Sequence, residues 1–94
     1  MSQDRLPMVQ AARIFELLSD ESRLRVLLLL ARSDGLSVTD LCEALGMTRP
    51  GMSHHLKLLR LGRLVESRRQ RKFSVYSLNS DLARKLLRYV KDAE

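Results

Sequence analysis

The stretch that decides the fold spans residues 37–59 and reads SVTDLCEALGMTRPGMSHHLKLL. Its apolar residues recur at helical spacing on both sides of Gly46, which predicts two short helices joined by a turn near 46–48. Ser37 or Thr39 can cap the first helix, Thr48 can cap the second, and Pro50 suits a first helical turn. The second helix is therefore expected at about 49–61. This layout is typical of a helix-turn-helix, whose second helix enters the DNA major groove.

Positive charge is concentrated in the same region. Residues 49–72 hold eight Lys or Arg residues and one acid, Glu66, a net charge of +7. The whole chain carries +6, which leaves −1 for everything outside this segment. Such segregation favours a polyanionic partner. The simpler alternative, a solvated basic face without a ligand, is disfavoured because the charge coincides with the helix-turn-helix pattern.

Length and composition limit the other classes of protein. A chain of 94 residues can bury one modest core, so a single domain over 1–94 is expected. The single cysteine excludes an intrachain disulfide, and no apolar run reaches the ~20 residues of a membrane span. The N-terminus, Met1–Pro7, lacks the hydrophobic core of a signal peptide. These features predict a cytoplasmic protein with no membrane partner.

Two helices are expected before the decisive stretch. Helical spacing predicts the first from about Pro7 to Leu18. The second begins at Ser19 or Asp20 and ends near Ala31. It is apolar nearly all round, so it is expected to be the central core helix, buried on most sides.

A hairpin and a last helix follow the decisive stretch. Gly62 is expected to end the helix over 49–61 in a left-handed conformation. Alternating residues then predict a hairpin, or wing, over about 64–78, with Arg69–Arg71 as its tip. A final helix over about 80–92, capped by Asn79 or Ser80, completes the chain. Four helices, a hairpin and a last helix predict a mainly α winged helix-turn-helix of the α+β class.

The helix over 49–61 has two faces when its residues are placed at 100° intervals. Arg49 on the polar face can donate two hydrogen bonds to guanine, and Ser53 and His54 can bond base edges. Lys57 and Arg60, further along, suit phosphates, and the cationic wing suits the backbone or the adjacent minor groove. The predicted contacts to double-stranded DNA are Thr48, Arg49, Gly51, Ser53, His54, Lys57, Arg60, Arg68, Arg69, Arg71 and Lys72.

Gly51 has two possible interpretations, and His55 is expected to have a structural role. Gly51 either lets the backbone approach DNA closely or is simply tolerated at a helix start. His55 falls on the apolar face, which predicts a partly buried structural histidine. Adjacent residues on a helix point about 100° apart, so His54 and His55 are not expected to chelate one metal.

Five blocks of the chain match a known family in sequence order: LSDESRLRVL (18–27), VTDL (38–41), MSHHLKLL (52–59), GRLV (62–65) and YSL (76–78). In these blocks the chain resembles the ArsR/SmtB family of bacterial and archaeal transcriptional repressors. The resemblance implies a homodimer built from the first and last helices, which binds a twofold-related operator and releases it when an inducer is sensed. The dimer-interface residues expected on these helices are Val9, Ala12, Phe15, Leu82, Leu86, Tyr89 and Val90.

This chain differs from the family at the positions of the sensing residues. Its metal sensors carry a Cys-x-Cys pair where this chain has Ser37 and Thr39, and others use Asp, His and Glu on a last helix that here contains Asp81 but no histidine. Zinc needs about four N, S or O ligands, so neither a metal nor a cofactor is expected. Cys42 is either a small residue where two helices pack closely or a thiol sensor.

The sequence distinguishes between three classes of function. The prediction is a sequence-specific DNA-binding regulator, a homodimeric repressor of an inverted-repeat operator. The alternative is a winged-helix protein-interaction module whose polar face contacts an acidic partner. An enzyme is not expected, because sequence neighbours such as Ser53 and His54 do not face each other on a helix and no orienting acid is evident.

Overall fold

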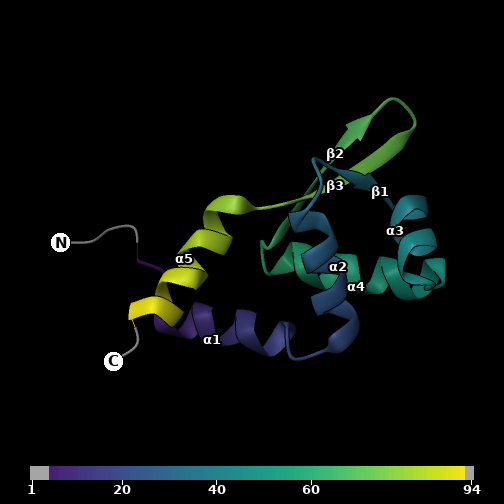
Figure 1. Cartoon of the computed structure of the whole chain (residues 1–94). Coiled ribbons are helices and arrows are strands. Elements are labelled where there is room, and N and C mark those ends of the chain that lie inside the picture. Colours follow the sequence, from purple (N-terminus) through teal and green to yellow (C-terminus); the bar gives the residue numbers. More distant parts are fainter. Residues whose placement is uncertain (1–4, 93–94) are drawn as a thin grey trace.

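The fold is described for residues 5–92 by a computed structural model (Figure 1). The predicted winged helix-turn-helix architecture is confirmed, with five helices and a three-stranded antiparallel sheet. The elements in chain order are α1 (Met8–Leu17), α2 (Glu21–Ala31), β1 (Leu36–Ser37), α3 (Val38–Leu45), α4 (Arg49–Leu61), β2 (Val65–Gln70), β3 (Phe73–Leu78) and α5 (Ser80–Asp92). The prediction that Met1–Pro7 is not a signal peptide falls largely outside the described residues, which begin at residue 5.

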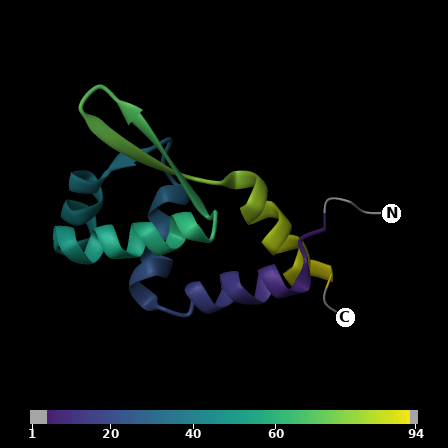
Figure 2. The same ribbon diagram turned by 180° about the vertical axis from the view of Figure 1, so that it is seen from behind.

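The elements divide the molecule into two ends (Figures 1 and 2). α3 and α4 lie together at one end, with the β2–β3 hairpin projecting beside them, while α1 and α5 lie together at the other. The molecule is elongated, with principal extents of 43 × 26 × 20 Å. No helix among residues 5–92 is long and apolar enough to cross a membrane.

Local side-chain hydrogen bonds start the helices at the predicted places. Asp20 accepts from the Arg23 amide at 3.0 Å, and Thr48 Oγ1 accepts from the Gly51 amide at 3.3 Å. Ser37 and Asp40 form a reciprocal capping box at the start of α3, with both hydrogen bonds at 3.1 Å. Asn79 Oδ1 accepts from the Leu82 amide at 3.3 Å, so Asn79 rather than Ser80 caps α5. These bonds satisfy amides that the first helical turn leaves without partners.

Residues from all five helices and from β2 form the core, and α2 contributes less to it than expected. Val26 and Leu30 are fully buried, but Leu28 remains 54% exposed and Leu24 38% exposed. The expectation of a helix buried on most sides is therefore wrong. One side of α2 packs on α3, α4 and β3, whereas Leu28 faces an open apolar groove that it lines together with Phe15 and residues of α5.

α4 ends at Leu61 as predicted, but the left-handed residue that follows it is one position later than expected. Gly62 is right-handed, with φ −81°, and the left-handed residue is Arg63, with φ 63°. The Arg63 amide donates to the Arg60 carbonyl and the Leu64 amide to the Leu59 carbonyl, the pattern of a Schellman motif. That motif places its left-handed residue just after the helix cap, at Arg63. Gly62 is instead packed close to α1, since an added Cβ would lie 2.6 Å from Leu17 Cδ1.

The sheet has one strand more than predicted, and its hairpin has a shorter tip. β1 pairs with β3 through Leu36–Tyr76 and Ser37–Val75, giving the order β1-β3-β2. β2 extends to Gln70, so Arg69 pairs with Ser74 inside the ladder rather than lying in the turn. The tip consists of Arg71 and Lys72 alone, and Arg71 takes a left-handed φ of 60°. The predicted tip Arg69–Arg71 is corrected accordingly.

Candidate nucleic-acid interface

α4 presents the polar face that the sequence predicts. Met52, Leu56 and Leu59 are fully buried, so the opposite side of the helix faces solvent. The side facing solvent carries five exposed polar residues, Arg49, Ser53, His54, Lys57 and Arg60, with Thr48 exposed at the cap. Gly51 is half-buried, and a Cβ there would lie 3.2 Å from Thr48 Oγ1. Gly51 therefore packs tightly against the cap of its own helix.

The first residue of α4 is bonded to α3. Arg49 Nη1 donates to Thr39 Oγ1 at 2.7 Å, and both side chains are exposed. The two residues are ten positions apart, so only the packing of α3 against α4 brings them together. Sequence reasoning placed Arg49 in the interface but did not identify Thr39 as its partner.

The predicted wing cations separate onto different faces of the hairpin. Arg68 and Arg69 are neighbours in β2, and successive residues of a strand point to opposite faces. Arg68 lies across from Val75, and Arg69 lies across from Ser74. Arg69 Nε donates to the Arg71 carbonyl at 3.2 Å, which links the Arg69 side chain on β2 to the tip of the hairpin. Arg71 and Lys72 are exposed at the tip itself.

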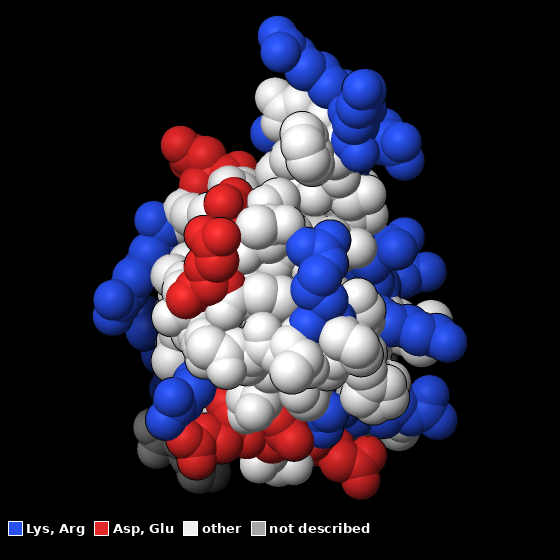
Figure 3. All heavy atoms as spheres, turned by 90° about the vertical axis from the view of Figure 1, so that its right-hand side faces the viewer, with Lys and Arg blue, Asp and Glu red and all other residues white. Residues whose placement is uncertain are grey.

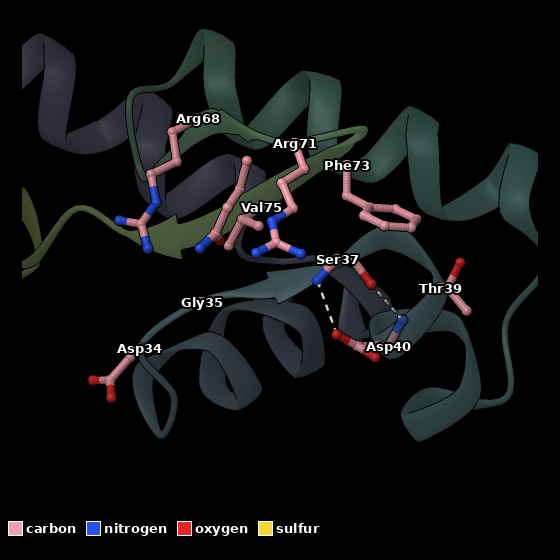
Figure 4. Close-up of a pocket in the computed structure, with 10 residues that line it drawn as sticks. Asp34, Gly35, Ser37, Thr39, Asp40, Arg68, Arg71, Phe73 and Val75 are labelled. Atoms are coloured by element: carbon pink, nitrogen blue, oxygen red, sulfur yellow. Dashed lines mark hydrogen bonds between the residues drawn. The ribbon is translucent and has the colours of Figure 1, made fainter.

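Arg68 and Arg71 point into a hollow between the wing and the start of α3 (Figure 4). This wing hollow has a volume of about 740 Å³ and is lined by Asp34, Gly35, Ser37, Thr39, Asp40, Arg68, Gln70, Arg71, Phe73 and Val75. Asp40 is engaged in the capping box with Ser37 on the side opposite the arginines. Sequence reasoning did not identify the hollow, because β1 and the full length of β2 create it.

The basic residues of the segment 49–72 remain available to a ligand. No carboxylate among residues 5–92 forms an ion pair with any of these eight cations, whereas three of the nine cations elsewhere, Arg25, Arg84 and Lys85, are paired with acids. Figure 3 shows Lys and Arg on the projecting wing and along the right-hand side of this view, and acidic residues at its left and along its lower edge, where further Lys and Arg also lie. The surface potential of the wing and α4 is therefore positive.

His55 has a structural role at the back of α4, as the sequence predicts. The ring is half-buried, and its Nδ1 lies 3.5 Å from Arg23 Nη1. Arg23 also donates from Nε to the Leu17 carbonyl at 2.7 Å, so it joins the α1–α2 turn to α4. Burial lowers the pKa of His55 below 6.5, Arg23 and His54 act in the same direction, and the carboxylate of Asp20 opposes them.

The candidate sensing residues are not gathered into a metal site. Within residues 5–92, no three His, Cys, Asp or Glu side chains come together as metal ligands would. Ser37 and Thr39, at the family's cysteine positions, are used in the capping box and in the bond to Arg49. Cys42 is a half-buried free thiol that packs against the core.

The predicted interface residues of the first and last helices divide between exposed and buried positions. Val9 is 65% exposed, Phe15 45% and Val90 61%, and Ala12 is also exposed. Leu82 and Leu86 are already buried in the single chain. Tyr89 is half-buried, with its hydroxyl donating to the Leu6 carbonyl and its ring 5.0 Å below the Arg5 guanidinium. An apolar groove of about 340 Å³ runs from Phe15 past Leu28 to Leu87 and Val90.

This fold, with an exposed basic recognition helix and a cationic wing, defines the winged helix-turn-helix class of proteins. A sequence-family model described as a helix-turn-helix domain matches residues 18–68, more than half of the chain. The arsenical resistance operon repressor of Escherichia coli is 43% identical over 67 residues, which cover 71% of this chain and 57% of the relative. A transcriptional repressor SmtB homolog of Synechocystis is 41% identical over 83 residues, which cover 88% of this chain and 62% of the relative. The chain thus spans about three fifths of the length of these two relatives.

Solved structures agree with the sequence relatives. A homodimeric winged helix-turn-helix DNA-binding domain from Mycobacterium bovis, titled a possible ArsR-family transcriptional regulator, superposes with a TM-score of 0.75 at 33% identity. The match covers 90% of this chain and 81% of that one. The chain belongs to the ArsR/SmtB family of winged helix-turn-helix regulators, and the resemblance read from its five sequence blocks is confirmed.

Proposed function

We propose that this chain is a sequence-specific DNA-binding transcriptional repressor that acts as a homodimer on an inverted-repeat operator. The observation that carries the proposal is the exposed cationic surface of α4 and the wing, whose seven Lys and Arg residues have no acidic partner among the described residues. Leaving such charges unpaired on one surface is expected where phosphates will supply the negative charge. The family relationship supports the same function, since both sequence relatives named above are repressors.

Within this proposal, the residues of the interface divide by role. The first turns of α4 enter the major groove, with Arg49, Ser53 and His54 toward base edges. Lys57 and Arg60, further along the helix, contact phosphates, and Thr48 lies near the backbone at the helix start. The wing cations Arg68, Arg69, Arg71 and Lys72 track the adjacent backbone or minor groove.

The homodimer is proposed to form through α1 and α5. The exposed side chains of Val9, Phe15 and Val90 belong to these helices, and the groove between them is lined almost entirely by apolar residues. A second copy would remove this surface from water, which favours association. Leu28 and Leu87, each 54% exposed, extend the surface beyond the residues expected from sequence.

The test is selection of DNA duplexes by the full chain from a random pool, followed by titrations at several salt concentrations. The proposal predicts an inverted repeat whose half-sites lie about one helical turn, or a multiple of it, apart. Arg49→Ala should relax the preference at one or two base pairs. Arg69→Ala should weaken all duplexes alike and reduce the slope of log K against log salt by about 1.

The alternative, a protein-interaction module, makes the opposite prediction for the same experiment. Binding that ignores sequence and disappears at physiological salt would favour it over the repressor. Recovery of no palindromic sequence would also count against sequence-specific DNA binding. The family relationship and the concentration of charge on α4 and the wing favour the repressor.

A further inference from the structure

The contact between Thr39 and Arg49 joins two helix starts that are each held in place by their own caps. The capping box of Ser37 and Asp40 fixes the first turn of α3, where Thr39 is the second helical residue. Thr48 fixes the first turn of α4, where Arg49 is the first. Gly46 closes the turn between the helices with a left-handed φ of 65°. The two backbones therefore lie in a defined relationship, which brings Thr39 Oγ1 to 2.7 Å from Arg49 Nη1.

The hydrogen bond leaves most of the guanidinium free. Arg carries five N–H donors in a planar fork, and Thr39 accepts only one of them. The donors on Nη2 and Nε remain available as a pair, which is the geometry that reads the O6 and N7 atoms of guanine. Thr39 fixes the orientation of the fork without occupying it.

An exposed arginine otherwise samples many rotamers, and fixing it on binding costs conformational entropy. A side chain that is oriented before DNA arrives loses less freedom when the complex forms. Thr39 is exposed and packs no core, so its substitution can be made without disturbing the fold.

We propose that Thr39 is a positioning residue for base recognition: its hydroxyl orients the Arg49 guanidinium toward a base edge and thereby sets the sequence preference of the recognition helix. The inference rests on the proposed DNA-binding function and adds to it a residue on α3 that specifies sequence through Arg49. It assigns no direct base contact to Thr39.

The experiment compares Thr39→Val with wild type, because valine keeps the branched shape and removes the hydroxyl. Competition titrations use the selected operator and duplexes changed at the base pairs that Arg49→Ala relaxes. Thr39→Val is expected to lose about three- to tenfold of the discrimination at those base pairs, the range for a typical intramolecular hydrogen bond. The salt slope and the melting temperature should stay at their wild-type values, because no phosphate contact or core contact changes.

Two further variants separate positioning from other effects. Thr39→Ser keeps the hydroxyl and should retain the wild-type preference. Thr39→Val added to Arg49→Ala should cause no further loss, because the residue it positions is gone. NMR of the free protein should show faster motion of the Arg49 Nε–H group in Thr39→Val than in wild type.

Three results would overturn the inference. Wild-type discrimination in Thr39→Val would show that Arg49 needs no partner, and an equal loss in the Arg49→Ala background would show that Thr39 acts independently. Tighter operator binding by Thr39→Val would show that the contact competes with DNA. In each of these cases wild type still selects an operator, whereas an absence of any preferred sequence for wild type would reject the proposed function together with the inference.

Discussion

Gly35 lies so close to β3 that a Cβ on it would fall 2.6 Å from Val75 Cγ1. Its φ of +153° is also a conformation that L side chains rarely adopt. Gly35 immediately precedes β1, and Ser37 in β1 pairs with Val75. The absence of a side chain at Gly35 therefore lets the chain pass from the end of α2 into β1 in close contact with β3.

Replacing Gly35 with Ala should destabilise the protein by about 1–3 kcal/mol, because both the contact and the backbone conformation become strained. Chemical denaturation with urea measures the change. Combining Gly35→Ala with Val75→Ala removes the contact but not the backbone strain, so the glycine substitution should cost about 1 kcal/mol less in that background. Equal costs in the two backgrounds would assign the effect to the backbone alone.

Arg63 gives a prediction of the opposite sign. It holds a left-handed φ of 63° in the Schellman motif after α4, which costs a residue with a Cβ roughly 1–2 kcal/mol. Arg63→Gly should raise the free energy of unfolding by about 0.5–1 kcal/mol, since the greater freedom of glycine in the unfolded chain offsets part of the gain. The hydrogen bond from Asn79 Nδ2 to the Arg63 carbonyl, at 2.8 Å, involves only the backbone of residue 63 and is retained.

Arg63→Ala serves as the matched control for that prediction. It removes the same side chain but keeps a Cβ in the left-handed conformation, so no gain is expected from it. A similar stabilisation in both variants, measured by thermal unfolding, would mean that the arginine side chain rather than its backbone is unfavourable.

The sequence predicts those parts of the fold that depend on local chemistry. Asp20 and Thr48 begin helices because a short polar side chain can accept from an amide a few residues ahead, and that information lies within one turn. The two faces of α4 follow from its periodicity in the same way. Both features were predicted correctly before any tertiary contact was known.

The features that were missed depend on tertiary contacts or on register. β1 has only two residues, too few for alternation to appear, and it exists because β3 supplies its partner. The separation of Arg68 from Arg69 requires knowing that β2 continues to Gln70. The exposed side of α2 carries Leu24 and Leu28 beside Glu21 and Arg25, so the apolar pattern alone does not show that these two leucines are uncovered. Thr39 and Arg49 meet only when α3 packs on α4.

The half-buried His55 predicts a dependence of stability on pH. Burial lowers its pKa in the folded state below the unfolded value of 6.5, so the unfolded chain binds more protons in the interval between the two values. The stabilisation is therefore complete above pH 6.5 and is lost as the pH falls toward the folded pKa. Protonation also places a cation 3.5 Å from Arg23 Nη1, where the neutral ring can accept a hydrogen bond.

His55→Gln should flatten the decrease in stability between about pH 7.5 and pH 5, because glutamine can accept from Arg23 without titrating in that range. Urea unfolding at several pH values measures this slope. His54→Gln removes one of the charges that lower the pKa of His55, so it should reduce the slope only in part, because burial is the main cause of the shift. Asp20 also makes stability depend on pH, but over a lower pH range. The hydrogen bond from the Arg23 amide lowers the pKa of Asp20, so its contribution to stability is present above pH 3.8 and is lost below it.

The single thiol leads to a prediction about signal response. Cys42 is half-buried between helices, and the sequence has no second cysteine with which it could form an intrachain disulfide. Cys42→Ser should bind the selected operator as tightly as wild type, and peroxide or polysulfide should release neither protein. Release of wild type but not of Cys42→Ser, followed by gel shift, would identify Cys42 as a thiol sensor.

Val90 on α5 tests the proposed dimer. Its side chain is 61% exposed in the single chain and borders the apolar groove, so a second copy packed there would bury it. Val90→Glu should weaken self-association about tenfold or more, because the dimer would have to desolvate a carboxylate without a partner. Leu61→Glu is the matched control, since Leu61 is 72% exposed at the end of α4 and lies outside the proposed interface. Sedimentation equilibrium should show weakened association for Val90→Glu alone, and equal association of both variants would place the dimer contact elsewhere.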